Sequence, residues 1–368
     1  MGRNLKINRD FVLFAVGAII GSAATWLYLK DIVDPGTWKD ADQIDTVKSS
    51  IIERDSDAET KGSASFNINE RLGECYIRAY LITIQNGVRE KYPLGTFLIQ
   101  TPSSSFDGMV HTVSMESYTP LLELKENPPP VGYFLPKGSN IMEEAYKIIR
   151  EHVRAPVVQA KSNEKLYNDF VANTDDKWIS FVSDLIANAK FELGLDELGR
   201  VLFLPVQDTA TLRHVAEFSD GNSSILYSDI SEEYDLYGIP NVVEVVYSKN
   251  NSNFYVRVIN DDPNSPTSTV SRGREIIYRD SNPEFSGEPT NYQIKEYANK
   301  LLQKLSTVEY KITFSHGYYP IRLGDCVLLN YKAAGINNVK AKVIKQSITC
   351  ETGCKVTETA VYTSKLWG

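Results

Sequence analysis

The segment Cys75-Tyr-Ile-Arg-Ala-Tyr80 has the pattern of a β-strand, in which successive side chains point to opposite faces of a sheet. Its tyrosines suit cross-strand pairs, and the 368-residue chain contains 21 tyrosines, mostly in segments of this kind. The sequence therefore predicts a mainly β protein, α+β overall, whose strands form barrels or sandwiches.

A first β-rich block surrounds this segment and covers residues 45–125. Turn residues such as Gln85-Asn-Gly87 separate its alternating stretches. Strands are expected at 62–68, 74–83, 95–102 and 108–118. The linker Glu126-Asn-Pro-Pro-Pro-Val-Gly132 ends the block because prolines interrupt regular elements.

An inserted α+β region is expected at residues 133–237. Its elements are helices over 138–152 and 175–190 and a hairpin of 191–195 with 200–205. Asn140 and Glu143 stand at capping-box spacing, and Thr174 precedes the second helix as its expected cap.

A second β-rich, barrel-like block is expected at residues 238–368. It includes a helix over 290–306, where Thr290 and Gln293 stand at capping-box spacing. Alternating segments follow this helix to the end of the chain, at 310–314, 325–331, 339–350 and 354–362.

The N-terminal run FVLFAVGAIIGSAATWLYL, residues 11–29, contains no charged side chain. Its length suits a transmembrane helix, and residues 1–32 are predicted to form a hydrophobic N-terminal helix. A signal peptide is the alternative, but the apolar stretch continues beyond the small residues Ala23 and Ala24. Gly17 and Gly21 form a Gly-x-x-x-Gly step that allows close helix packing.

The four cysteines leave three interpretations open. Cys350 and Cys354 flank Glu-Thr-Gly, a three-residue hairpin loop, while Cys75 and Cys326 lie far away in the sequence. Buried thiols, a hairpin disulfide and a metal site all remain, although the C-x3-C spacing is not that of a zinc knuckle.

Catalytic, metal-binding and cofactor motifs are missing from the sequence. The net charge of −8 argues against a nucleic-acid-binding surface, and the four histidines have no metal-ligand spacing. No nucleophile elbow, P-loop or dinucleotide fingerprint occurs. We therefore predict a protein that is not an enzyme, with no catalytic residues, metal or cofactor.

From about Val47 onward, the chain resembles the central hub proteins of phage tails and baseplates, a trimeric ring found also at the base of contractile-injection spikes. The resemblance rests on the order of several motifs: Glu74-Cys-Tyr-Ile-Arg78, Leu94-Gly-Thr-Phe-Leu-Ile-Gln100, Tyr118-Thr-Pro-Leu-Leu-Glu-Leu124, Arg154-Ala-Pro156, Ile239-Pro-Asn-Val-Val-Glu-Val245, Arg272-Gly-Arg274, His316, Leu323-Gly-Asp325 and Lys365-Leu-Trp367. The residues of these motifs singled out as structural are Arg78, Gly95, Gln100, Arg154, Asn241, Arg272, Arg274, His316, Gly324 and Asp325.

This resemblance implies two barrel-like tube domains per chain, with Leu94–Gln100 and Leu323–Leu329 in similar strands that each follow a Leu-Gly turn. It also implies a homotrimer in the virion, assembled in the host cytoplasm, that meets the tail tube, tip or spike, and tape-measure proteins. An acidic lumen would let DNA pass without binding.

The apolar N-terminus departs from the hub pattern. Three such helices could pack inside the ring, contact the tape-measure protein, or enter the host membrane through residues 11–29. Two other functions stay open: a membrane-anchored or exported bacterial β-domain binding protein, and a tail-associated cell-wall hydrolase.

Overall fold

A computed structural model describes most of the chain, namely residues 25–44, 50–68, 72–85, 88–106, 111–207, 209, 211–221, 226–249, 252–285, 288–351 and 353–367. The chain divides into two compact units. Unit 1 comprises Met1–Ile230 and Phe314–Ala360, and unit 2 comprises Ser231–Thr313 and Val361–Gly368. Residues 238–368, expected as one domain, are thus shared between the two units.

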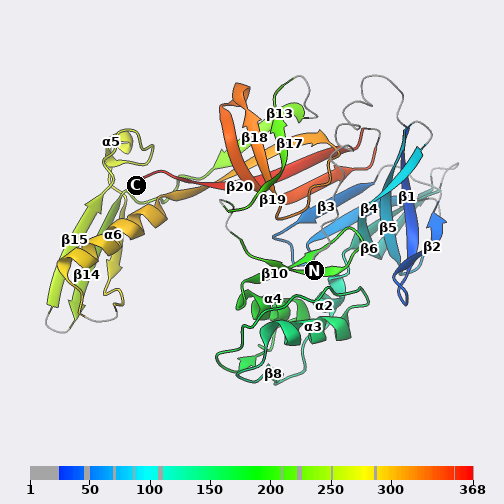
Figure 1. The fold of residues 1–368 in the computed structure, drawn as a ribbon, viewed down its shortest axis with the longest axis horizontal. Helices are drawn as coiled ribbons and strands as arrows, with labels where there is room; N and C mark the ends of the chain where they lie inside the picture. Colours follow the sequence, from blue (N-terminus) through cyan, green and yellow to red (C-terminus); the bar gives the residue numbers. More distant parts are fainter. Residues whose placement is uncertain are drawn as a thin grey trace. The chain divides into compact units, whose positions relative to one another are not determined.

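The first β-rich block is a run of seven neighbouring strands in the described part of unit 1 (Figure 1). They are β1 (Thr25–Asp34), β2 (Lys39–Ile44), β3 (Ile51–Asp55), β4 (Gly62–Ile68), β5 (Tyr76–Gln85), β6 (Val88–Phe106) and β7 (His111–Tyr118). Their order in the sheet is β3-β4-β7-β6-β5-β1-β2.

Strand β5 contains the alternating tyrosine segment, and the strand predicted there is confirmed. Ile77, Ala79 and Leu81 point to one face, where they join the main core of the block. Tyr76 points to the other face and packs with Val33 and Leu98. Because both faces are covered, the alternation separates two packing environments rather than core from solvent.

The N-terminal helix prediction is wrong for its last residues. Residues 25–29 belong to β1, which pairs antiparallel with β5 over Thr25–Val33 and with β2 on its other side. A short apolar run fits a strand as well as the end of a helix, and the pairing of Thr25–Val33 with β5 decides for a strand here. Residues 1–24, including Gly17 and Gly21, lie outside the described residues. Among the described helices, none is long and apolar enough to cross a membrane.

Six later strands continue the same sheet rather than forming a separate one. They are β12 (His214–Ser219), β13 (Leu226–Tyr234), β17 (Thr307–Gly317), β18 (Cys326–Tyr331), β19 (Ile336–Thr349) and β20 (Lys355–Lys365), with a short 3-10 helix at Lys332–Ala334 between β18 and β19. Strand β19 pairs antiparallel with β3, so that the described strands form one thirteen-stranded sheet. Eleven of the strands follow one path from β13 to β2, and β12 and β18 branch from it at β19. The main β content is as predicted, but two separately closed barrels are not seen among the described strands.

The turn between β19 and β20 contains Cys350 and Cys354, the two cysteines that lie close together in the sequence. Cys350 and Cys354 are thiols, and both are buried in the core of the first block together with Ile348 and Val356. The C-terminal hairpin therefore completes the core that β3 to β7 begin.

The inserted region forms a body of three helices with two small sheets (Figure 1). Its elements are α2 (Leu122–Glu126), β8 (Phe134–Leu135), α3 (Ile141–His152), β9 (Phe170–Val171), α4 (Trp178–Ala187), β10 (Phe191–Leu195) and β11 (Val201–Pro205). Asn140 caps α3 by accepting from the Glu143 backbone N–H, as predicted. The second helix starts later than expected, after Lys177 rather than Thr174. The β10–β11 hairpin is confirmed.

Unit 2 is a three-stranded sheet with one helix on it (Figure 1). The strands β14 (Val242–Lys249), β15 (Ser252–Ile259) and β16 (Ile277–Ser281) lie in the order β15-β14-β16, and the short helix α5 (Thr269–Arg272) precedes β16. Helix α6 (Asn291–Leu305) packs Ile294, Ala298 and Leu302 on one sheet face. Its predicted Thr290–Gln293 capping box is present.

Candidate functional site

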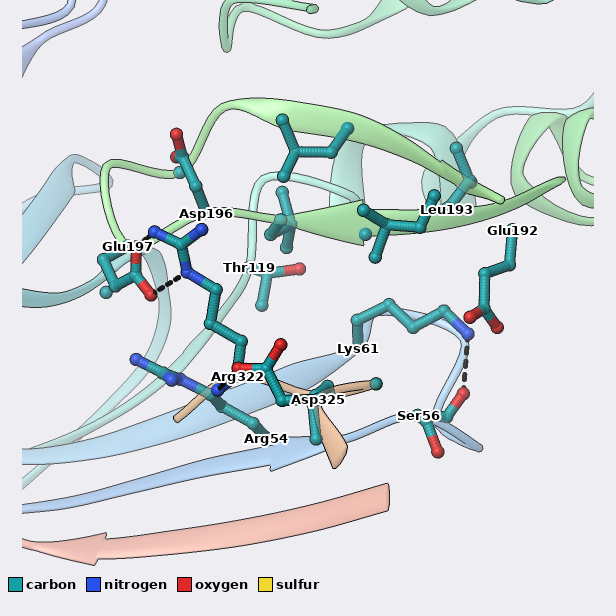
Figure 2. A pocket seen from close by; sticks show the side chains of 18 of the residues that line it. Arg54, Ser56, Lys61, Thr119, Glu192, Leu193, Asp196, Glu197, Arg322 and Asp325 are labelled. Atoms are coloured by element: carbon teal, nitrogen blue, oxygen red, sulfur yellow. Dashed lines mark hydrogen bonds and ion pairs between the residues drawn. The ribbon is translucent and has the colours of Figure 1, made fainter. Parts of the chain in front are cut away.

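A cavity of about 210 Å³ lies in unit 1 where several segments that are distant in the sequence meet (Figure 2). Its walls come from β3, β6, the β10–β11 hairpin and the turn before β18. The hairpin turn Asp196-Glu-Leu-Gly199 forms one side, and Arg54, Arg322 and Asp325 lie across from it in Figure 2. We call this meeting point of the turn with its surroundings the junction.

An ion pair joins the hairpin turn to the C-terminal segment. Arg322 donates through Nε and Nη2 to the two carboxylate oxygens of Glu197, each at 2.6 Å. This bidentate geometry is the strongest arrangement for a guanidinium and a carboxylate. Figure 2 shows the Arg322 side chain directed at the turn.

The same turn is also fixed to the first β block. The carbonyl oxygen of Leu198 accepts from the Trp38 indole N–H at 2.7 Å and from Arg78 Nη2 at 3.1 Å. Arg78 is buried, with 4% of its surface exposed, and its Nε donates to Thr96 Oγ1. The β1–β2 turn, β5, β6 and the C-terminal segment therefore all hold one four-residue turn.

Gly199 is required by this packing. It has a left-handed backbone with φ of 74°, and a Cβ there would lie 2.6 Å from the Thr96 Cβ. A side chain at this position would meet both the backbone strain and the wall of β6.

A buried polar network runs from the junction into the sheet. Arg54 and Gln346 are cross-strand partners on β3 and β19, and Arg54 Nη1 donates to Gln346 Oε1 at 2.7 Å. Gln346 Nε2 in turn donates to Glu358 Oε1 at 2.7 Å. His316 Nε2 lies 3.3 Å from the same Glu358 oxygen, and both side chains are fully buried.

The histidine in this network has a determined hydrogen-bond role. His316 Nδ1 lies 2.6 Å from the carbonyl oxygen of Gly317, which can only accept, so Nδ1 carries a proton. The ring also stacks on Phe218 with centroids 4.5 Å apart. Hydrogen bonds at the two ring nitrogens and stacking on Phe218 therefore fix the orientation of the imidazole.

The acidic groups of the junction differ in their electrostatics. Burial raises the pKa of the Glu197 carboxyl, but the hydrogen bond from Arg322 and the charges of Arg54 and Arg322 outweigh it and leave the pKa below its usual 4.5. Burial raises the pKa of Asp325 above its usual 3.8, against the hydrogen bond from the Arg322 backbone N–H. The junction therefore favours charge on Glu197 and disfavours it on Asp325.

Five of the residues singled out from the sequence lie in or beside the junction. Gly95, Gly324 and Asp325 line the cavity, Arg78 holds the turn, and His316 ends the polar network. Gly324 lies in a turn with φ of 86°, whereas Gly95 lies within β6 beside the Phe97 ring. The expectation that the two strands each follow a Leu-Gly turn is therefore wrong for the first strand, because Gly95 lies inside β6, where β5 and β6 shift register.

The other singled-out residues lie elsewhere. Arg154 binds Glu123 through its backbone N–H and its Nε, and Gln100 lies at a register shift between β6 and β7. The remaining three are in unit 2, where the Asn241 side chain spans the Arg274 carbonyl and the Ile276 N–H, and Arg272 donates to the carbonyls of Ile239 and Leu236.

Five residues of the junction and its network belong to none of the motifs singled out in the sequence: Arg54, Glu197, Arg322, Gln346 and Glu358. Their partners lie far along the chain: Arg322 is 125 positions from Glu197, and Arg54 is 292 positions from Gln346. The only local indications were the Asp196–Gly199 turn and the Leu-Gly-Asp motif that follows Arg322. Neither indication pairs the two segments.

Comparison with solved structures gives long matches of low sequence identity. The tail protein from Neisseria meningitidis MC58 is 13% identical with a TM-score of 0.61, and the match covers 91% of this chain and 96% of that one. The 43 kDa tail protein of prophage MuSo2 from Shewanella oneidensis is 10% identical with a TM-score of 0.61, and covers 91% and 98%. The chain has the fold of phage tail proteins. The resemblance that the sequence motifs indicated is confirmed at the level of the fold.

No protein-family model and no curated protein sequence matches the chain. The likeness is therefore one of three-dimensional structure. It includes the inserted body as well as the β blocks, because it extends over nine-tenths of both tail proteins and of this chain.

Replacement of Gly199 by alanine tests the packing at the junction. We expect Gly199→Ala to lower the free energy of unfolding by about 2–5 kcal/mol, the sum of a left-handed backbone penalty and a clash with Thr96. Gly132→Ala is the matched control, because Gly132 has a similar φ of 78° but no atom near the added Cβ. It should cost only about 1–2 kcal/mol in the same urea titration. Equal losses in the two variants would show that the contact with Thr96 is unimportant.

The acidic groups of the junction predict two opposite pH dependences. A carboxyl with a lowered folded-state pKa adds stability above its unfolded pKa and loses it as the pH falls through the folded-state value. Glu197→Gln should therefore cost on the order of 1 kcal/mol near pH 7, and the difference from wild type should shrink as the pH falls below 4.5 and through the lowered folded-state pKa of Glu197. Asp325→Asn should instead be favourable near pH 7, because the charged form of Asp325 is disfavoured, and this gain should also disappear in acid. Unfolding titrations at several pH values measure both. A constant difference for either variant across the pH range would contradict the assignment.

Proposed function

We propose that this chain is a structural, non-enzymatic component of a phage tail, the homotrimeric hub that connects the tail tube to the tail tip or spike. The observation that carries the proposal is the fold, which matches two tail proteins over 91% of the chain. In this role it resides in the virion after assembly in the host cytoplasm, and contacts tail tube, tip and tape-measure proteins.

The continuous sheet of unit 1 supports a ring-forming role. A single chain contributes strands from both of its β-rich blocks to one path, joined by β3 and β19. Three such chains would supply six blocks, the number that a sixfold tube requires. Among the described strands β2 ends the path, and its first five residues are exposed, so we propose this edge for the contact with a neighbouring subunit.

The chemistry of the junction supports a mechanical role. Arg322 is paired with Glu197, Arg54 with Gln346 and main-chain carbonyls, and Lys61 donates to the Ser56 carbonyl. These groups connect segments of the chain. The net charge of −8 also suits a channel through which DNA slides without binding.

The solution mass of the full chain tests the proposal. Size exclusion coupled to light scattering, in a mild non-ionic detergent because residues 11–24 are apolar, should give three times the 41.3 kDa mass of one chain. A variant that lacks residues 2–24 keeps β1 intact and is the control, and it should give the same ratio. A monomer or dimer for both proteins would contradict the trimeric hub.

A further inference from the structure

An open pocket of about 500 Å³ lies in unit 2, where the end of β13 and the loop after it meet the first residues of β17. The buried side chains that line it, Ile239 and Val308, are apolar. Tyr234, which is 52% exposed, adds an aromatic ring to the lining. The pocket therefore has an apolar inner surface that reaches the solvent at a tyrosine.

Two further tyrosines hold the Tyr234 ring in place. The ring packs against Tyr310 with centroids 4.7 Å apart, and Tyr310 stacks on Tyr362 with centroids 4.9 Å apart. The Tyr362 hydroxyl in turn donates to Glu232 Oε1 at 2.7 Å. Because Tyr234 packs against Tyr310 on one side, its exposed part is presented to the solvent in a fixed orientation.

The exposed charged groups of the pocket are mainly acidic. Glu233, Asp235 and Glu309 are exposed, and Lys311 is the one basic side chain among the described residues that line the pocket. Within the described part of the chain, none of the three carboxyl groups forms an ion pair, and Asp235 accepts from the backbone N–H of Tyr237 at 2.7 Å. Three carboxyl groups against one ammonium group leave negative charge that no neighbouring side chain neutralises.

The loop that forms one wall of the pocket is fixed within unit 2. Arg272 donates through Nη1 to the carbonyl oxygen of Ile239 and through Nη2 to that of Leu236, each at 2.8 Å. This guanidinium therefore binds main-chain carbonyls and does not pair with a carboxylate of the pocket. A wall that is already held in place lowers the entropic cost of binding a ligand.

The combination of an apolar interior, an aromatic ring and acidic groups selects for a particular ligand chemistry. Lysine and arginine side chains bury an aliphatic stem and keep a cationic end near water, and such cations are attracted to tyrosine rings. A nucleic-acid backbone does not fit, because its phosphates would meet carboxylates. A metal ion does not fit either, since the described residues include no group of three or more His, Cys, Asp or Glu that could hold one.

We propose that this pocket binds a lysine or arginine side chain of a basic protein segment. The aliphatic stem lies against Ile239 and Val308, and the cationic end lies beside Tyr234 and is neutralised by Glu233 and Glu309. The inference rests on the geometry of unit 2 and does not depend on the proposed tail function.

Peptide selection on the full chain tests this pocket. The probe is a random dodecapeptide library displayed on filamentous phage and panned on the immobilised full chain, and fluorescein-labelled copies of the selected peptides are measured by fluorescence polarisation. We expect the selected peptides to contain lysine or arginine. Glu309→Lys, which replaces a carboxylate of the pocket by a cation, should weaken their binding at least tenfold. Tyr234→Leu, which keeps an apolar side chain but removes the ring, should weaken it at least threefold.

A matched variant separates the pocket from the general attraction of an acidic protein for basic peptides. Glu288→Lys makes the same change in net charge as Glu309→Lys, and Glu288 is exposed on the far side of α6, a helix of 15 residues that is about 22 Å long. It should change peptide affinity less than twofold. Thermal unfolding confirms that each variant is folded. Selected peptides without lysine or arginine, equal losses for Glu309→Lys and Glu288→Lys, or affinity unchanged by Tyr234→Leu would each overturn the inference.

Discussion

The antiparallel pairing of β3 with β19 is the constraint on which the rest of unit 1 depends. It joins residues 51–55 to residues 345–349, so that the two ends of the sequence become neighbours in one sheet. On its inner side Ile52 meets Ile348 in the core and Arg54 meets Gln346 in the polar network. On its outer side Lys345 donates to Asp55 at 2.8 Å. One ladder therefore carries backbone, apolar and ionic contacts between segments that no local pattern connects.

The junction extends this constraint to the inserted body. The hairpin turn at Asp196–Gly199 accepts hydrogen bonds from both β-rich blocks. The acceptors are the Glu197 carboxylate, which binds Arg322, and the Leu198 carbonyl oxygen, which binds Trp38. Gly199 allows the turn to approach β6 closely. The body is thus anchored at its hairpin tip by directional hydrogen bonds, while its own core of helix and hairpin residues is separate.

Local elements could be predicted from the sequence where local physics decides them. The caps at Asn140 and Thr290 and the tyrosine alternation of β5 each depend on neighbouring residues only, and each was placed correctly. The prediction for the N-terminal run failed because a short apolar run fits a strand as well as the end of a helix, and the pairing with β5 that decides between them is not local. The candidate site was predictable only in part. Glycines and Asp325 stood out in turn motifs, but Glu197 pairs with Arg322 across 125 residues, and no spacing rule identifies such a partner.

Amide hydrogen exchange of the full chain, read by mass spectrometry, tests most directly that β3 and β19 unite the two β-rich blocks. Peptides covering residues 51–55 and 345–349 should open with the same free energy, because breaking either side of the ladder exposes the other. They should also exchange together with the peptides of β4 and β7. Exchange of the C-terminal strands well before those of the first block would show that the blocks are independent and would contradict the account.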